Sequence, residues 1–245
     1  NPLGPPPGLV DFLKENLNAI TALPEVDSSL VLHSFADRYG VDPATVLAGN
    51  GSTQFIYSIP LALGSKKALI IGPTYADYAD ACSMHNVRCE YFIAQETQAF
   101  KADITILNKQ VKGFDTVFIC NPNNPTGTLY TGAEIESLCK TFPDTYFVID
   151  ESYLPFVVSG DHESMIGRGL PNVIILNSMS KIFRISGLRI GFIIASKTII
   201  ETLARYSLPW SVNALAQAGV RYLMEQNAEV KAFMDRTHKL IKKKK

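Results

Sequence analysis

Apolar residues recur along the chain with two different periods. Short runs typical of buried strands occupy residues 67–71, 88–93, 116–120, 146–149, 173–177 and 189–195. Apolar positions spaced three to four apart predict helices over residues 9–17, 30–39, 53–63, 75–84, 103–109, 132–141, 199–206 and 214–240. Strands that alternate with helices of this length predict βαβ units. We therefore expect an α/β fold, a three-layer α/β/α arrangement around one mainly parallel sheet.

Composition along the chain predicts an arm and a body. Residues 1–30 are rich in Pro, Asn and Asp, with one short helical pattern, and are typical of an N-terminal arm that packs on a larger domain. Residues 31–245 carry the alternating pattern and are predicted to form one large domain. A chain of 245 residues that is 47% apolar can bury a sizeable core.

Charge and cysteine usage exclude several classes of function. Lys plus Arg and Asp plus Glu are equal at 23 each, so no overall field favours nucleic acid or a membrane surface. No apolar run approaches the roughly 18–20 residues of a membrane span. The four cysteines lack C-x-x-C spacing and the four histidines lack metal-ligand spacing, so we expect buried thiols and no metal. These features favour a cytoplasmic protein, with Lys242–Lys245 as a solvated end.

Candidate chemistry begins at Lys181, which we expect on a strand-to-loop edge, in the run Ser178-Met179-Ser180-Lys181, with Arg189 eight residues further on. Lysine forms Schiff bases with carbonyl compounds. Serine hydroxyls and an arginine guanidinium suit a phosphate dianion. The S-x-S-K pattern alone is weak because Ser and Lys are common at surfaces, but three upstream segments strengthen it.

The first of these segments is Ala-Gly-Asn-Gly-Ser-Thr-Gln at residues 48–54, directly before a helical pattern. Glycines followed by Ser52 and Thr53 describe a loop that opens a helix. The free N–H groups and the positive dipole at such an end bind phosphate. The alternative is a plain turn in which Ser52 or Thr53 caps the helix.

The second segment is Asn-Pro-Asn-Asn-Pro-Thr-Gly at residues 121–127, directly after the strand pattern of residues 116–120. Its prolines, asparagines and glycine predict a sharp polar turn at the carboxyl end of a strand. Ligands of open α/β sheets lie at that edge. The Asn124 amide would be well placed there to donate to a cofactor oxygen, although a purely structural turn has the same composition.

The third segment is residues 146–153, where an apolar run ends in Asp150-Glu151 before Tyr153. An unpaired buried carboxylate is costly, so a strand buried on both faces rarely ends in two acids without a partner. A cationic heteroaromatic nitrogen would be such a partner. The alternative, a cap for the following segment, fits one of the two acids better than both.

In this order the four segments resemble the fold-type-I pyridoxal-phosphate enzymes of the class I/II aminotransferase group. The opening residues 1–8, Asn-Pro-Leu-Gly-Pro-Pro-Pro-Gly, and the run Leu-Pro-Trp-Ser-Val-Asn-Ala-Leu-Ala at 208–216 further resemble the threonine-phosphate decarboxylases of the cobalamin pathway. Those are relatives of the histidinol-phosphate aminotransferases. Family members continue past this C-terminus. We therefore expect most of a small domain to be missing, with the Arg that binds the substrate carboxylate.

The resemblance implies a role for each candidate residue. Lys181 would carry pyridoxal phosphate as a Schiff base, and Asp150 would pair with the pyridinium nitrogen. Tyr75, in Pro73-Thr74-Tyr75, would stack on the ring, while Asn124 and Tyr153 would hydrogen-bond its phenolic oxygen. The catalytic set would thus be Lys181, Asp150 and Tyr153. The cofactor phosphate would be held by Ser52, Thr53, Ser178, Ser180 and Arg189.

The implied activity is that of a lyase that decarboxylates a phosphorylated amino acid. The resemblance also implies a homodimer. Histidinol-phosphate or related aminotransferase activity is the second interpretation, and a non-catalytic pyridoxal-phosphate-binding fragment is the third. A dinucleotide-binding domain is excluded because no G-x-G-x-x-G follows the first strand. Two positions depart from the family pattern. Leu23 stands before Pro24-Glu25 where a tyrosine that reaches the partner subunit's phosphate is common, and Gln54 stands where an acid is common.

Overall fold

The computed structural model describes residues 1–244 and contains a seven-stranded sheet in the order β1-β7-β6-β5-β4-β2-β3. The neighbours from β3 to β6 pair in parallel, whereas β7 is antiparallel to both β6 and β1. The predicted α/β fold with a mainly parallel sheet is therefore confirmed. The strands are β1 Val46–Gly49, β2 Lys67–Gly72, β3 Arg88–Ile93, β4 Thr116–Cys120, β5 Tyr146–Asp150, β6 Val173–Asn177 and β7 Gly191–Ile194.

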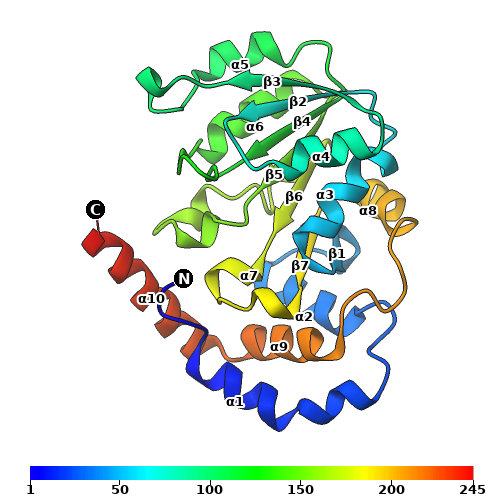
Figure 1. Cartoon of the computed structure of the whole chain (residues 1–245), viewed down its shortest axis with the longest axis vertical. Coiled ribbons are helices and arrows are strands. Elements are labelled where there is room, and N and C mark those ends of the chain that lie inside the picture. Colours follow the sequence, from blue (N-terminus) through cyan, green and yellow to red (C-terminus); the bar gives the residue numbers. More distant parts are fainter. Residues whose placement is uncertain (245) are drawn as a thin grey trace.

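Two apolar clusters lie on opposite faces of this sheet and make the three layers visible in Figure 1. Successive strand residues alternate between them: Val117 and Ile119 of β4 face one cluster, and Phe118 and Cys120 face the other. Helices α3, α4 and α8 cover the second face, while α1, α2, α5, α6, α7 and α9 cover the first. The helices are α1 Pro7–Glu15, α2 Ser29–Tyr39, α3 Gly51–Ala62, α4 Asp77–Met84, α5 Ile104–Gln110, α6 Gly132–Thr141, α7 Met179–Ile182, α8 Lys197–Ala204, α9 Ala214–Glu225 and α10 Asn227–Lys244.

Three local expectations are corrected. The single helix expected over residues 214–240 is two helices, because the chain leaves helical conformation at Gln226 (ψ 58°). Strand β1 was not expected, since four residues are too few to show an alternation and pairing with β7 defines the strand. Lys181, expected on a strand-to-loop edge, lies in the short helix α7 directly after β6.

The N-terminal segment is tied to the last two helices. The Gly8 amide donates to Glu229 Oε1 at 2.9 Å, and Gln217 Nε2 donates to the carbonyl of Glu25 at 3.0 Å. Figure 1 shows this segment running along the end of the molecule beside α9 and α10. The boundary between arm and body at residue 30 stays a prediction. Within residues 1–244, no helix combines the length and apolar character needed to cross a bilayer.

Candidate functional site

All four sequence segments lie at one edge of the sheet, and three of them follow neighbouring parallel strands. The fourth, residues 48–54, follows β1, whose Gly49 pairs with Gly191 of β7 beside the end of β6. In the parallel strands, Cys120 at the end of β4 pairs with Asp150 at the end of β5, and Asp150 pairs with Leu176 near the end of β6. The turn of residues 121–127, the acid pair and the Ser178–Lys181 run therefore follow three neighbouring strands at their carboxyl ends. This is the edge at which open α/β sheets hold ligands.

Asp150 is a buried carboxylate aimed into the α3/α4 side of this edge. Its side chain is on a residue only 5% exposed, with Oδ2 accepting from the Tyr78 hydroxyl at 2.7 Å and Oδ1 from the Ser152 amide at 2.9 Å. No ion pair within residues 1–244 involves Asp150. A buried carboxylate with neutral donors and no cation fits a cationic ring nitrogen as its missing partner.

Tyr78 is the residue of this cluster that sequence reasoning missed. It lies fully buried in α4, with its ring stacked on Phe118 at a centroid distance of 5.3 Å and the Tyr75 ring edge-on at 5.8 Å. Burial, and then the charge of Asp150, raises the pKa of Tyr78, so the hydroxyl stays protonated and donates. Its sequence context is typical of an ordinary aromatic residue in the core. Only its place three residues after Tyr75 could have pointed to a polar role.

The two tyrosines that were predicted, Tyr75 and Tyr153, lie within the electrostatic reach of Asp150. Tyr75 is 38% exposed, and its pKa is raised by partial burial, then by Asp77, with Asp150 adding a smaller effect. Burial also raises the pKa of Tyr153, to which Cys120 and Asp150 add. Asp150, Tyr75, Tyr78 and Tyr153 therefore form one group, which we call the acid cluster. Asn124 stands half-buried on the turn after β4.

The second group gathers at the start of α3. We call residues 50–54 together with Arg189 the anion loop. Arg189 folds over this helix end: its Nη2 atom donates to the Asn50 carbonyl at 3.3 Å, and a Cβ on Gly51 would lie 2.4 Å from the same nitrogen. Gly51 also has φ +78°, which favours glycine. No side chain caps this helix start. Free N–H groups beside a guanidinium are suited to a phosphate.

Backbone packing fixes the anion loop against the sheet. A Cβ on Gly191, the first residue of β7, would lie 2.2 Å from the Ser52 amide nitrogen, so strand and helix start touch through their main chains. Gln54 closes the loop from within, since its Oε1 atom accepts from the Asn50 amide at 2.7 Å. Glutamine at position 54 thus supplies the acceptor without adding a negative charge to the loop.

Along the chain, Lys181 lies between Tyr153 of the acid cluster and Arg189 of the anion loop. Its side chain forms no hydrogen bond with either group in the part of the chain that the structure describes. It is exposed in α7, and within the described part of the chain its amine has no hydrogen-bond or ion partner. Ser178 and Ser180 are both 3% exposed, and the Ser180 hydroxyl donates to the carbonyl of Ile190 at 3.4 Å. The structure thus places Ser180 beside the residue that follows Arg189. Thr53 is half-buried in the first turn of α3.

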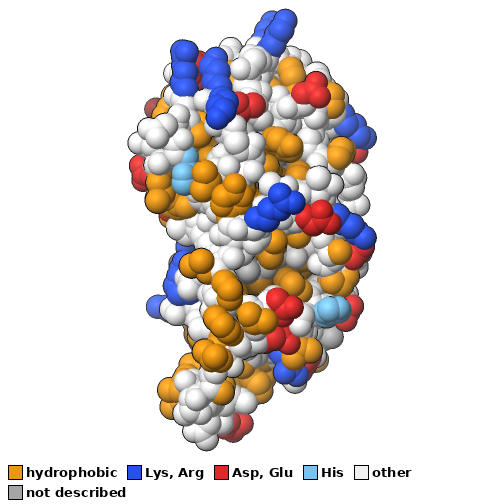
Figure 2. All heavy atoms as spheres, turned by 90° about the vertical axis from the view of Figure 1, so that its right-hand side faces the viewer, with side chains coloured by type: hydrophobic (Ala, Val, Ile, Leu, Met, Phe, Trp, Pro, Cys, Tyr) orange, Lys and Arg blue, Asp and Glu red, His pale blue; other side chains and the backbone are white. Residues whose placement is uncertain are grey.

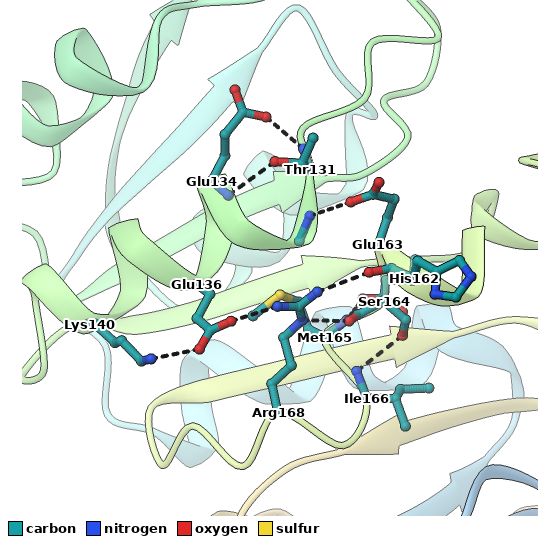
Figure 3. A network of polar contacts seen from close by, with 12 residues as sticks. Thr131, Glu134, Glu136, Lys140, His162, Glu163, Ser164, Met165, Ile166 and Arg168 are labelled. Atoms are coloured by element: carbon teal, nitrogen blue, oxygen red, sulfur yellow. Dashed lines mark hydrogen bonds and ion pairs between the residues drawn. The ribbon is translucent and has the colours of Figure 1, made fainter. Parts of the chain in front are cut away.

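Glu151 faces away from the site and has a local structural role. At 2% exposure, its carboxylate accepts from the Ser164 hydroxyl and the Met165 amide, each at 2.6 Å. The same loop is fastened to α6 by Arg168, which reaches Glu136 at 2.6 Å in the network of Figure 3. Glu151 directly follows the last residue of β5, and successive residues of an extended chain point to opposite faces, so Glu151 serves the fold while Asp150 faces the candidate site.

The sequence of this chain matches a known family of proteins. The family model described as "Aminotransferase class I and II" matches residues 18–245. The chain is 29% identical over 235 residues to a threonine-phosphate decarboxylase from Salmonella typhimurium, covering 93% of this chain and 64% of that relative. It is 30% identical over 248 residues to a histidinol-phosphate aminotransferase from Brevibacillus brevis, covering 99% of this chain and 67% of that one.

A solved structure shares both sequence and fold. The L-threonine-O-3-phosphate decarboxylase from Porphyromonas gingivalis is 34% identical, superposes with a TM-score of 0.82, and is matched over 92% of this chain and 67% of its own. The chain thus spans about two thirds of the length of these relatives.

Proposed function

The chain belongs to the aminotransferase class I and II family, and on this premise we propose that it is a pyridoxal-phosphate enzyme that decarboxylates a phosphorylated amino acid, foremost L-threonine-O-3-phosphate. Support for the cofactor comes from the two groups of residues just described. The anion loop offers N–H groups and Arg189 to a phosphate, and the acid cluster offers Asp150 to a cationic ring nitrogen. The Lys181 amine is available for covalent attachment.

Each residue has a defined task in this proposal. Pyridoxal phosphate, when bound, supplies a protonated ring that takes up the negative charge left when a bond at the substrate Cα breaks. Asp150 holds the proton on the ring nitrogen, and Tyr78 keeps its carboxylate in place. Lys181 holds the cofactor and moves protons at the substrate Cα once its amine is displaced.

The remaining predicted residues bind and orient the cofactor. Tyr75 would cover one face of the ring, while Asn124 and Tyr153 would donate to its ring oxygen. The phosphate would be held by hydroxyl groups and one guanidinium, from Ser52, Thr53, Ser178, Ser180 and Arg189.

The choice of decarboxylation rests on two segments. Residues 1–8 and 208–216, which carry the resemblance to threonine-phosphate decarboxylases, both touch the site. Asn1 Nδ2 donates at 2.8 Å to the carbonyl of Ile182, next to Lys181. Asn50 Nδ2 donates at 3.3 Å to the carbonyl of Ser211, which brings the second segment onto the anion loop. Substrate-side contacts select the bond that breaks, and the resemblance of these two segments to the decarboxylases is what supports the lyase in this proposal.

Histidinol-phosphate aminotransferase activity is the second candidate. The 30% identity to the Brevibacillus enzyme supports it as strongly as sequence identity supports the decarboxylase. The residues proposed to bind the cofactor serve both reactions. A non-catalytic cofactor-binding protein is the third interpretation, and it requires cofactor uptake without turnover of either substrate.

Product analysis separates the three. With pyridoxal phosphate and O-phospho-threonine, the protein should release carbon dioxide and form an aminopropanol phosphate without a keto acid. The matched control is histidinol phosphate with 2-oxoglutarate. Turnover in the control alone would replace the lyase with the aminotransferase, and turnover in neither would favour the non-catalytic interpretation. Lys181→Ala should abolish turnover. It should also lack the absorbance band of the Schiff base, which borohydride removes in the wild type by fixing the cofactor on Lys181.

We also propose that the protein works as a homodimer. The N-terminal arm and the segment after α8 expose large apolar side chains, and the Trp210 amide joins the two segments by donating to the Val26 carbonyl at 3.1 Å. Figure 2 shows hydrophobic side chains gathered over the lower part of one face, where Figure 1 places the arm. The exposed members are Leu17, Ile20, Leu23, Val26, Leu208 and Trp210. A second copy would cover this surface. Sedimentation of the wild type and of the double variant Leu208→Ser, Trp210→Ser tests whether this surface holds the dimer together.

A further inference from the structure

Asn123 joins two loops through every polar atom of its side chain. Its Nδ2 group donates to the carbonyl of Pro73 and to the Thr126 hydroxyl, both at 2.8 Å. Its Oδ1 atom accepts from the Thr74 hydroxyl at 2.6 Å. Residue 123 lies on the turn after β4 and residues 73–74 on the loop after β2, and these two strands are neighbours in the sheet. We call the contacts of Asn123 with Pro73 and Thr74 the Asn123 bridge.

The side chain is not needed to close its own turn. The main chain of Asn123 does that, because its carbonyl accepts from the Gly127 amide at 2.7 Å and its amide donates to the Thr128 carbonyl at 2.8 Å. Asn121 anchors the turn from the other end through two side-chain hydrogen bonds with Tyr130. Apart from one hydrogen bond to Thr126, the Asn123 side chain is therefore left to hold the neighbouring loop.

The bridge connects the two segments that carry proposed ring contacts. Tyr75 follows Thr74 directly, and Asn124 follows Asn123 directly. In the described part of the chain, the hydrogen bonds between residues 73–76 and the turn of residues 121–127 are those of the bridge. The bridge is thus the hydrogen-bonded link between the segments that carry Tyr75 and Asn124.

We infer that Asn123 is a positioning residue. With Thr74 it fixes the spacing between Tyr75 and Asn124, and so the seat of the cofactor ring between them. This inference rests on the proposed function, since it assigns the bridge a purpose only if a ring binds there. Asn123 itself need not touch the ring, because it acts through the backbone of the two loops.

Thr74→Val and Asn123→Ala test the bridge at two strengths. The first removes one hydroxyl donor and preserves shape, and the second removes all three hydrogen bonds. We expect the dissociation constant of pyridoxal phosphate to rise about tenfold in Asn123→Ala and by a smaller factor in Thr74→Val. The matched control is Thr202→Val on α8, which also loses a threonine hydrogen bond, of 2.8 Å to the Thr198 carbonyl, and should bind the cofactor as wild type does.

A double-mutant cycle distinguishes positioning from simple loss of stability. Tyr75→Ala should weaken cofactor binding at least threefold less in the Asn123→Ala background than in wild type, because the ring contact is already misplaced. Multiplicative, independent effects of the two substitutions would overturn the inference. So would wild-type cofactor affinity in both Asn123→Ala and Thr74→Val.

Hydrogen exchange on the cofactor-free protein supplies a readout that does not depend on activity. In Thr74→Val and Asn123→Ala, amides of residues 74–79 should exchange faster, with those of α6 unchanged. Unchanged exchange at residues 74–79 would show that the bridge does not hold the loop and would overturn the inference. Wild-type protein that takes up no pyridoxal phosphate would instead overturn the proposed function. The exchange result would then report separately on whether the bridge holds the loop.

Discussion

The Tyr78 hydroxyl donates a 2.7 Å hydrogen bond to Oδ2 of Asp150, from a residue 72 positions earlier in the chain. The bond joins α4 to the end of β5 and is fully buried. Because burial, and then the charge of Asp150, raises the pKa of Tyr78, the proton stays on the phenol, which donates to Asp150. The orientation of the acid at the centre of the candidate site is therefore set by a helix that packs on the sheet.

Tyr78→Phe removes this hydrogen bond and little else. A hydrogen bond to a charged group is worth about 1.5–3 kcal/mol, so the free energy of unfolding should fall by that order in urea denaturation. The value of kcat should fall about tenfold, because the carboxylate is no longer held toward the ring nitrogen. Asp150→Asn, which removes the charge itself, should lower kcat further. Equal rates in Tyr78→Phe and wild type would show that Asp150 is oriented without Tyr78.

Arg189→Ala should weaken cofactor binding by roughly tenfold to a hundredfold. The guanidinium lies over the uncapped start of α3, and charge-assisted hydrogen bonds of this kind contribute about 1.5–3 kcal/mol. Equilibrium dialysis with pyridoxal phosphate measures the change. Exposed Arg205 at the end of α8 is the matched control, and Arg205→Ala should bind normally. Unchanged affinity in Arg189→Ala would place the cofactor phosphate elsewhere.

Gly191→Ala should destabilise the protein by about 1–3 kcal/mol or more, since overpacking against rigid atoms costs that much. The new Cβ would lie 2.2 Å from the Ser52 nitrogen, and main-chain atoms cannot swing aside as a side chain can. Gly187→Ala is the control, because its Cβ would meet nothing within 4 Å. Urea denaturation of the two variants should differ clearly. Equal midpoints would mean that α3 can move away from β7.

The sheet and most helices could be predicted because their apolar periods extend over five or more residues. Strands β4 and β5 match their expected ranges closely. Asp150 was predicted as a candidate because two carboxylates at the end of a buried strand are costly without a partner. The break at Gln226 could not be predicted, since the apolar period continues through it and no glycine or proline marks it. Strand β1 was too short to show a period.

The cross-chain contacts of the site were beyond the sequence for a different reason. Tyr78 and Asn123 have unremarkable neighbours, and their roles come from partners 72 and 49 residues away. Residue type and spacing indicate which groups can bind a ligand. They do not indicate which buried hydroxyl or amide holds those groups in place, because that depends on which strands become neighbours in the sheet.

Glu151→Gln should change how stability depends on pH. Burial raises the pKa of Glu151 to about 7 from an ordinary value of 4.5, so the folded protein binds this proton more tightly than the unfolded chain. The contribution is therefore full below about pH 4.5 and is lost as pH rises toward 7, by about 3 kcal/mol at 1.36 kcal/mol per pKa unit. Glutamine has no proton to lose, so the variant should lack this decline.

Urea denaturation of both proteins at pH 5, 6, 7 and 8 measures the effect as a difference, in which the other titrating groups cancel. Wild type should lose stability relative to Glu151→Gln as pH rises to 7, and the two curves should run parallel above about pH 8. Glu136→Gln is the control. Lys140 and Arg168 lower the pKa of Glu136, so its proton is released before pH 5 and its substitution should leave the slope unchanged. Parallel curves for wild type and Glu151→Gln over the whole range would show that Glu151 is ionised in the folded protein at pH 5.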